Sequence, residues 1–189
     1  MTIEDTNRLR VRELTFDDVS ALSEILGDPA VMHYSTRGVQ TPTETKRFIE
    51  QCIESYVENG TGQWALVDKT SSSFVGFCGL SSVLIDGIQE VEIGYRLSRR
   101  FWGQGLATEA ASQVLAHGFE HIGLKSVVAI IAPDHHASAR VAEKIGFTTF
   151  INTRYAGWQV RIYRTLLAEW RCNTHNMTLN PDAARRRAG

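Results

Sequence analysis

Cysteine, excess charge of one sign and long apolar runs are all scarce in this sequence. Its three cysteines, Cys52, Cys78 and Cys172, are odd in number, far apart and never spaced as Cys-x-x-Cys, which argues against a disulfide framework and a zinc knuckle. This cysteine usage fits a reducing cytosol, so we expect a cytoplasmic protein. The 20 Lys and Arg residues nearly balance the 21 Asp and Glu residues, so any anionic partner must be held by a local site.

Signals for secretion and membrane insertion are lacking as well. The longest apolar run, residues 127–132, is far shorter than the ~20 residues that cross a bilayer. Residues 1–9 carry two acids and lack the apolar stretch of a secretory signal. We therefore expect neither secretion nor membrane insertion, and no membrane or nucleic-acid partner.

The composition that is present is that of a folded globular chain. Of the 189 residues, 43% are apolar and 22% are charged, which argues against disorder. The length is usual for one domain. Apolar residues thin out late in the chain, so we expect a single domain over 1–172 and a solvated C-terminal tail over 173–189.

Hydrophobic periodicity divides the chain into alternating strands and helices. Because a helix links the fourth strand to the fifth, these two strands should run parallel, and the fold should be a mixed α/β layer. The spacing also predicts a loop over 33–42. Strands are expected at 8–14, 63–68, 74–80, 91–97, 126–132, 148–155 and 158–166, and helices at 17–26, 43–58, 105–122 and 137–145.

The most informative segment, residues 99–110, reads Arg-Arg-Phe-Trp-Gly-Gln-Gly-Leu-Ala-Thr-Glu-Ala. Gly103 and Gly105 follow a strand and open an amphipathic helix. The first amides of a helix have no internal partners and lie at its positive end, and glycines let phosphate oxygens approach them. The segment therefore predicts an anion site. A dinucleotide fingerprint would need glycine in place of Thr108, and the Gly-Lys-Ser/Thr of a Walker loop is absent.

The motif Arg100-x-x-Gly103-x-Gly105, followed by Leu-Ala-Thr-Glu-Ala, resembles the acetyl-CoA pyrophosphate loop of the GNAT superfamily of N-acetyltransferases. Four further segments are similar, in the same order, to the branch that contains the ribosomal-protein N-terminal acetyltransferases: 76–80, 92–97, 137–147 and 163–170. The resemblance covers residues 8–170. It implies the α/β GNAT fold, a mixed and mostly antiparallel sheet with a parallel pair at the fourth and fifth strands and helices on both faces.

The resemblance implies acetyl-CoA as co-substrate. Its pantetheine arm would pair with the fourth strand where this strand splays from the fifth, and its pyrophosphate would take amides from the glycine loop. The family's common Asn-x-x-Ser is His135-x-x-Ser138 here, a departure at its first position. The cofactor-binding residues implied are Tyr95, Arg96, Leu97, Arg100, Gly103, Gln104, Gly105, Leu106, Ala107, Thr108, His135 and Ser138.

Acetyl transfer to an amine requires a neutral amine, and at pH 7 only roughly 10% of a free α-amino group is neutral. A general base is therefore useful. Alternation along the fourth strand places Glu90, Glu92 and Arg96 on one face. Glu92 is the expected base, because Glu-Ile-Gly-Tyr resembles the family's own fourth strand. The alternative is that both acids are solvated charges on an open sheet face.

The departing thiolate needs a proton donor. The tyrosine that many family members place four residues before a Gly-Phe pair is Ala142 here. By resemblance to the ribosomal-protein branch, the expected acid is Ser138, and Tyr155 is a second candidate. The alternative for Ser138 is a helix-capping or backbone-bonding role. The residues expected near the acceptor are Tyr34, Glu90 and Tyr155.

Other reactive side chains have plainer interpretations. Cys78 lies in the middle of a strand with no histidine tied to it, which favours a core thiol over a nucleophile. His117 and His121 share a helix face but lack a third ligand, so no metal is expected.

The sequence thus predicts an N-acetyltransferase that moves the acetyl group of acetyl-CoA directly to a primary amine. The resemblance points to a protein N-terminus or a ribosomal protein as acceptor. A small-molecule amine stays open, because loops 33–42 and 155–158 carry no recognisable code for the acceptor. The alternative of another class is a non-catalytic acyl-CoA-binding module. A homodimer is a common assembly among similar proteins.

Overall fold

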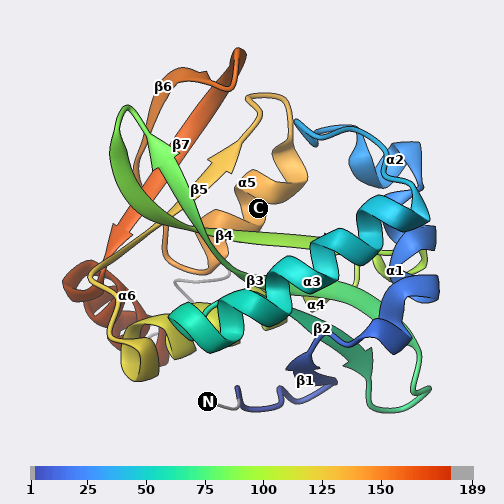
Figure 1. The fold of residues 1–189 in the computed structure, drawn as a ribbon. Helices are drawn as coiled ribbons and strands as arrows, with labels where there is room; N and C mark the ends of the chain where they lie inside the picture. The colour runs from blue at the N-terminus through green and yellow to red at the C-terminus, as the bar shows by residue number, and fades with distance from the viewer. Residues whose placement is uncertain (1–2, 180–189) are drawn as a thin grey trace.

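A single seven-stranded sheet organises the chain, in the order β1-β2-β3-β4-β5-β7-β6 (Figure 1). The computed structural model describes residues 3–179. All neighbouring strands are antiparallel except β4 and β5, which are parallel, so the predicted fold class is confirmed. The strands are β1 (Leu9–Glu13), β2 (Gln63–Asp68), β3 (Phe74–Ile85), β4 (Ile88–Leu97), β5 (Ser126–Ile131), β6 (Phe150–Tyr155) and β7 (Trp158–Leu166).

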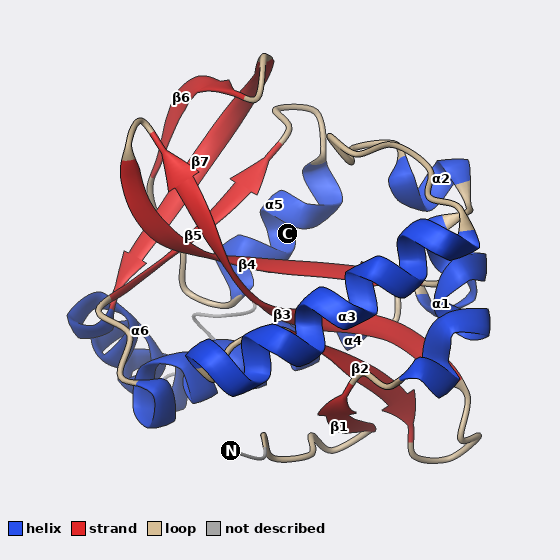
Figure 2. Ribbon diagram, in the orientation of Figure 1, coloured by secondary structure: helices blue, strands red, loops and turns tan. Residues whose placement is uncertain are grey.

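Helices cover both faces of the sheet (Figure 2). One apolar cluster joins the first helices of the chain to Ala65 and Phe77 of the sheet, and a larger one joins the later helices to the opposite face. The α-helices are α1 (Val19–Leu26), α2 (Pro29–Met32), α3 (Pro42–Asn59), α4 (Leu106–His117), α5 (His136–Lys144) and α6 (Leu167–Leu179), with shorter turns η1 (Phe16–Asp18), η2 (Arg99–Phe101) and η3 (Gly118–Ile122). None of the helices within residues 3–179 is long and apolar enough to cross a membrane.

The hairpin of β3 and β4 is longer than the sequence predicted at both of its strands. Ile85 pairs with Ile88 across a tight turn in which Asp86 and Gly87 have φ angles of 50° and 81°. Positive φ at both central residues matches the right-handed twist of a hairpin, and Asp-Gly is a favoured pair there. The predicted strands at 74–80 and 91–97 stopped short because residues 81–90 lack strict alternation.

Helix boundaries differ from expectation at three further places. A single turn, α2, follows α1, because the Asp28 carboxylate accepts the Ala30 amide proton at 2.9 Å and Pro29 occupies the first helical position. The expected helix 105–122 is α4 followed by the π turn η3. The chain also re-enters a helix at Leu167, so α6 spans the expected start of the tail at 173, and residues 180–189 lie outside the described part.

Candidate active site

The parallel strands β4 and β5 diverge at the centre of the sheet (Figure 2). Within residues 3–179, one register pair, Glu92 opposite Val128, joins them. Past this pair, β4 stays bonded to β3 as far as Leu97, and β5 stays bonded to β7. The β4 backbone beyond Glu92 thus has its hydrogen-bonding groups on the β5 side without a strand partner in the described chain.

The two faces of β4 carry different chemistry. Arg96 pairs with Phe77 of β3, and Phe77 packs into the apolar cluster of α1, α2 and α3. Arg96 and Glu92 therefore lie on the face that α1 and α3 cover, because cross-strand partners share a face. Ile93 and Tyr95 pack into the opposite cluster with α4 and α5. The even and odd positions separate as the alternation predicted.

The glycine loop joins β4 to α4. Gly103 and Gly105 have φ angles of 74° and 78°, in the left-handed region that a side chain disfavours. Gly105 is the N-cap of α4, and no side chain caps this helix. The amides that open α4, at residues 106–108, donate to no acceptor within the described residues. The loop therefore presents free donors at the positive end of a helix.

Side chains of the loop fold back onto the protein rather than over these amides. Trp102 donates its indole proton to the Leu97 carbonyl at 2.8 Å, and the Gln104 side chain donates to the Arg100 carbonyl at 2.9 Å. The Arg100 guanidinium donates to the Phe74 carbonyl at 3.4 Å. The predicted cofactor residues at 100–108 thus lie together in this loop and the first turn of α4.

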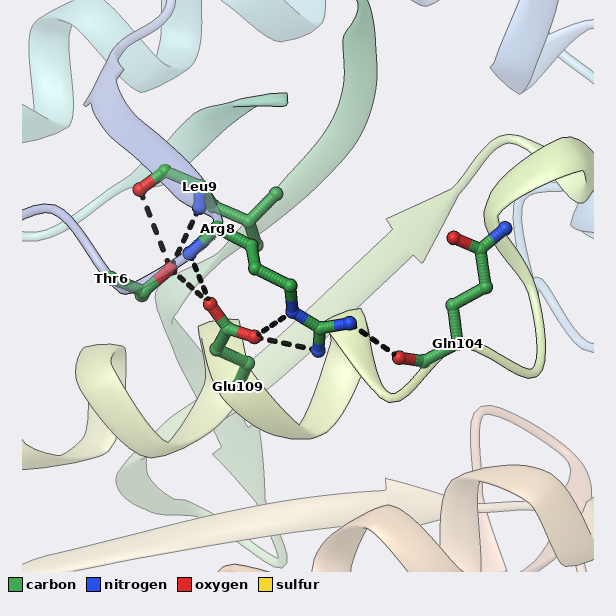
Figure 3. A network of polar contacts seen from close by, with 5 residues as sticks. All are labelled: Thr6, Arg8, Leu9, Gln104 and Glu109. Carbon is green, nitrogen blue, oxygen red and sulfur yellow. Dashed lines mark hydrogen bonds and ion pairs between the residues drawn. The ribbon is translucent and has the colours of Figure 1, made fainter. Parts of the chain in front are cut away.

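A polar network ties this loop to β1, and the sequence analysis did not identify it (Figure 3). Arg8 donates through its backbone amide and side chain to the Glu109 carboxylate, at 2.8 and 2.6 Å, and to the Gln104 carbonyl at 2.9 Å. Thr6 donates to the same carboxylate at 2.6 Å. Burial alone would raise the pKa of Glu109, but these bonds hold it below its usual range. The ionised Glu109 anchors the first turn of α4.

Glu92 lies at the point of divergence, and its environment suits a proton acceptor. Burial raises its pKa to about 7, against the charge of Arg96 and a hydrogen bond from the Ile130 amide. Near pH 7 the carboxyl group is thus present in both protonation states, as a general base requires. Glu90, on the same face, is held in an ion pair by Arg164 of β7. The structure thereby distinguishes two acids that alternation alone could not.

His135 and Ser138 lie together where α5 begins. The Ser138 hydroxyl lies 3.4 Å from Nε2 of His135, and the Tyr95 hydroxyl donates to the Ser138 carbonyl at 3.2 Å. Burial, followed by the charge of Arg96, lowers the pKa of His135 to about 4, so the ring is neutral at pH 7. The Ser138 hydroxyl contacts this ring, and no side chain within the described residues caps α5, which does not support the helix-capping alternative.

Tyr34, in the loop after α2, and Tyr155, at the end of β6, each lie near one of the predicted site residues. Tyr34 stacks on His135 with ring centroids 4.0 Å apart, and its hydroxyl donates to the Asp134 carbonyl at 3.4 Å. Tyr155 ends β6, and burial, then the charge of Glu92, raise the pKa of its hydroxyl, against the charge of Arg37. Tyr34 therefore lies against the start of α5, and Tyr155 lies within electrostatic reach of Glu92.

Two groups set aside by the sequence analysis are placed in the interior. Cys78 is buried in the core, and burial raises the pKa of its thiol, which makes it a poor nucleophile. His117 is 3% exposed and stacks on His121 with centroids 5.2 Å apart. Within residues 3–179 no group of side chains could hold a metal ion.

Comparison with known proteins identifies the relatives of this chain. The family model described as acetyltransferase (GNAT) domain matches residues 8–148. YkkB of Bacillus subtilis is 36% identical over 142 residues, 75% of this chain and 82% of YkkB. The crystal structure of a GNAT-family acetyltransferase from Bacillus anthracis aligns with a TM-score of 0.73 at 26% identity, over 89% of this chain and 99% of that one.

A third comparison concerns a protein of the same fold with a bound ligand. RimL, a ribosomal L7/L12 α-N-protein acetyltransferase solved in complex with coenzyme A, aligns with a TM-score of 0.71 at 18% identity. The alignment covers 88% of this chain and 98% of RimL. At this identity the likeness concerns the fold.

Proposed function

Since the chain belongs to the GNAT family of acetyltransferases, we propose that it moves the acetyl group of acetyl-CoA directly to a primary amine. The observation that carries this proposal is the position of Glu92. It stands at the pair that joins β4 to β5, next to unpaired β4 backbone, with a pKa raised to about 7. A base at this position can take the proton of an amine that attacks a thioester held along β4.

The residues present fit acetyl-CoA. Positive φ angles at Gly103 and Gly105 and the uncapped start of α4 form a cradle that a side chain would fill, and its amides suit a pyrophosphate. Tyr95, Arg96 and Leu97 have no strand partner on the β5 side of β4, which suits the amide groups of a pantetheine arm. The Tyr95 and Leu97 carbonyls accept from the side chains of Arg96 and Trp102 in the structure, so these two side chains would have to yield to the arm. When bound, acetyl-CoA supplies the activated acetyl group. The residues of the chain hold and orient the two substrates and move the protons.

We assign the proton donor to Ser138. A His135 tautomer with its proton on Nε2 would donate to the Ser138 oxygen and leave the hydroxyl proton free to face the departing sulfur. The lowered pKa of His135 keeps the ring neutral at pH 7, so no extra positive charge is placed beside the amine. Tyr155 is the second candidate donor, on the side of Glu92.

The acceptor that this site suits best is an α-amino group. Its ordinary pKa of ~7.7–8.0 lies close to that of Glu92, whereas a lysine near ~10.4 would hold its proton far more tightly. The fold shared with RimL supports a protein N-terminus as one such acceptor. A small amine remains the alternative. We also propose that the catalytic domain spans residues 1–172.

A turnover assay over matched amines tests the proposal. Peptides with a free N-terminus, the same peptides blocked there but carrying lysine, and small primary amines would be compared by release of coenzyme A thiol and by product mass. We expect acetylation of the α-amines. Binding of acetyl-CoA by calorimetry without turnover on any amine would instead identify a non-catalytic acyl-CoA-binding module.

A further inference from the structure

We propose that the acceptor carries a carboxylate a few bonds from its amine, and that the Arg96 guanidinium binds this carboxylate while Glu92 takes the amine proton. This inference rests on the proposed function, because it concerns the acceptor of the same site. The acceptor class is then a free amino acid or a peptide whose N-terminal residue is acidic.

Arg96 has the chemistry of an anion receptor. Its side chain is partly buried, and its hydrogen bond in the structure runs from Nη1 to the Tyr95 carbonyl at 3.2 Å. No carboxylate of the described residues lies within 4.0 Å of its guanidinium nitrogens. A guanidinium offers five donors in a fork that matches a carboxylate, and partial burial without an anion is costly. Arg96 therefore has no anionic partner among the described residues.

The spacing of Arg96 and Glu92 fits an amino acid between them. Four strand residues at ~3.3 Å each separate their Cα atoms by about 13 Å along one face. Glutamate and arginine side chains are long enough to cover most of this distance, so an amine joined to a carboxylate could bridge the two charged groups. Each charge still affects the other, since Glu92 opposes the lowering of the Arg96 pKa that burial causes.

The surroundings favour an anion beside Arg96. The nearby ring of His135 is neutral at pH 7, and Arg37, in the loop between α2 and α3, adds a positive charge that Tyr155 senses. Asp134 is exposed, and its backbone carbonyl is the group that accepts from Tyr34. Of the two acids that share this face of β4 with Arg96, Glu90 is held by Arg164, which leaves Glu92 as the acid next to Arg96 along the strand.

We do not expect the pyrophosphate of acetyl-CoA to be the anion for Arg96. Arg96 pairs with Phe77 and shares its face with α1 and α3, whereas the uncapped amides for the pyrophosphate open α4, which packs against the other face. The pantetheine arm near β4 is uncharged. A carboxylate on the acceptor is the remaining partner for this guanidinium.

The test compares matched acceptors that differ in one carboxylate. Amino acids and their carboxamides form one arm, and peptides beginning with Asp or Asn form the other, so that the arms separate the two sources of the carboxylate. Coenzyme A thiol release gives kcat and KM for each. We expect the wild-type protein to prefer the carboxylate member of at least one arm by ~10- to 100-fold, the range for a hydrogen bond to a charged group.

Substitution of Arg96 assigns this preference to its side chain. Arg96→Gln should raise KM for the carboxylate member and abolish the preference, with KM for acetyl-CoA unchanged, while Arg96→Lys should keep part of it. Arg10→Gln, an exposed change on β1 at the far edge of the sheet, is the matched control. Circular dichroism checks that each variant is folded.

Three outcomes would overturn the inference. The first is equal kcat/KM for both members in wild type, and the second is an Arg96→Gln variant that loses rate equally on both. The third is an increase in KM for acetyl-CoA alone. Each of these leaves acetyl transfer itself intact. Absence of turnover on any amine would instead refute the proposed function. Calorimetry of the carboxylate member, with coenzyme A present, would then still test Arg96, because Arg96→Gln should weaken binding of this member at least tenfold. Equal binding to wild type and Arg96→Gln would overturn the inference.

Discussion

The ring of Tyr34 lies flat on the ring of His135, with centroids 4.0 Å apart and planes inclined by 15°. This contact joins the loop after α2 to the start of α5. It buries one side of the His135 ring, and burial is the main reason that the pKa of His135 falls to about 4. The stack thus couples the position of the loop over 33–42 to the protonation state of His135.

Removal of this stack should loosen acceptor binding and free the histidine to titrate. Tyr34→Ala exposes the His135 ring, so we expect its pKa to rise toward the ordinary 6.5 and KM for the amine to increase several-fold. Proton NMR of the histidine resonances against pH measures the first effect. Tyr34→Phe keeps the ring and loses the 3.4 Å bond to Asp134, so a large effect of this control would place the role in the hydroxyl.

Glu92 should control the acidic limb of the pH profile. Its pKa is raised from 4.5 to about 7, so the fraction of basic carboxylate, and with it kcat/KM, rises as pH increases through about 7. Glu92→Gln removes the basic electron pair and should lower kcat by ~100-fold or more with that limb abolished. Steady-state rates between pH 5 and pH 9 would be measured.

Glu90 provides the comparison for this assignment. Glu90→Gln breaks the ion pair with Arg164, so we expect a modest loss of thermal stability and a pH profile that retains its acidic limb. The assignment of the base would move to Glu90 if the limb disappeared in this variant and survived in Glu92→Gln.

The parts of the site that the sequence predicted rest on local rules. Alternation is fixed by the two-residue period of a strand, so the common face of Glu92 and Arg96 could be deduced. The anion loop followed from Gly103 and Gly105 ahead of a helix. The Asp86-Gly87 pair carried a local signal for the hairpin as well, and the missing alternation around it hid the longer strands.

The remaining features depend on contacts between distant segments. Arg8 and Glu109 are separated by 101 positions, and no periodicity links them. The same holds for Tyr34 with His135, and for the ion pair that distinguishes Glu90 from Glu92. Burial also has to be known before the pKa of Glu92 can be judged, because desolvation is its main cause.

Gly105 should be essential for acetyl-CoA binding. Gly105→Asp introduces a negative charge and a side chain at a φ angle of 78° beside the α4 amides, so affinity should fall well over tenfold in calorimetry. Gly87→Asp, at a φ angle of 81° in the distant β3–β4 turn, imposes similar backbone strain and should leave affinity unchanged. Equal affinities in both variants would remove the pyrophosphate site from this loop.

The network around Glu109 should set the position of the same loop. Glu109→Gln keeps the shape of the side chain and loses the charge that Arg8 and Thr6 contact. Because the effect on the ligand is indirect, we expect acetyl-CoA affinity to fall about three- to tenfold, within the range of one ordinary hydrogen bond. kcat at saturation should change little, because Glu109 touches no reacting atom. A drop in kcat with unchanged affinity would contradict a positioning role.

The variants His135→Asn and Ser138→Ala separate the two residues at the start of α5. His135→Asn restores the residue common in similar proteins and can still hold a hydrogen bond to Ser138, so we expect a rate within a few-fold of wild type. Both variants should remain folded, since neither side chain belongs to the apolar core.

Ser138→Ala should slow turnover with little effect on acetyl-CoA affinity. If the Ser138 hydroxyl donates to the departing sulfur, its bond strengthens as negative charge develops, so its loss lowers kcat rather than binding. Removal of one such donor costs ~100-fold or more. Thiol release with an accepted α-amine, together with calorimetry, measures both quantities. A Ser138→Ala enzyme at full rate beside an inactive His135→Asn enzyme would transfer the proton donor to His135, whose Nε2 lies 3.4 Å away.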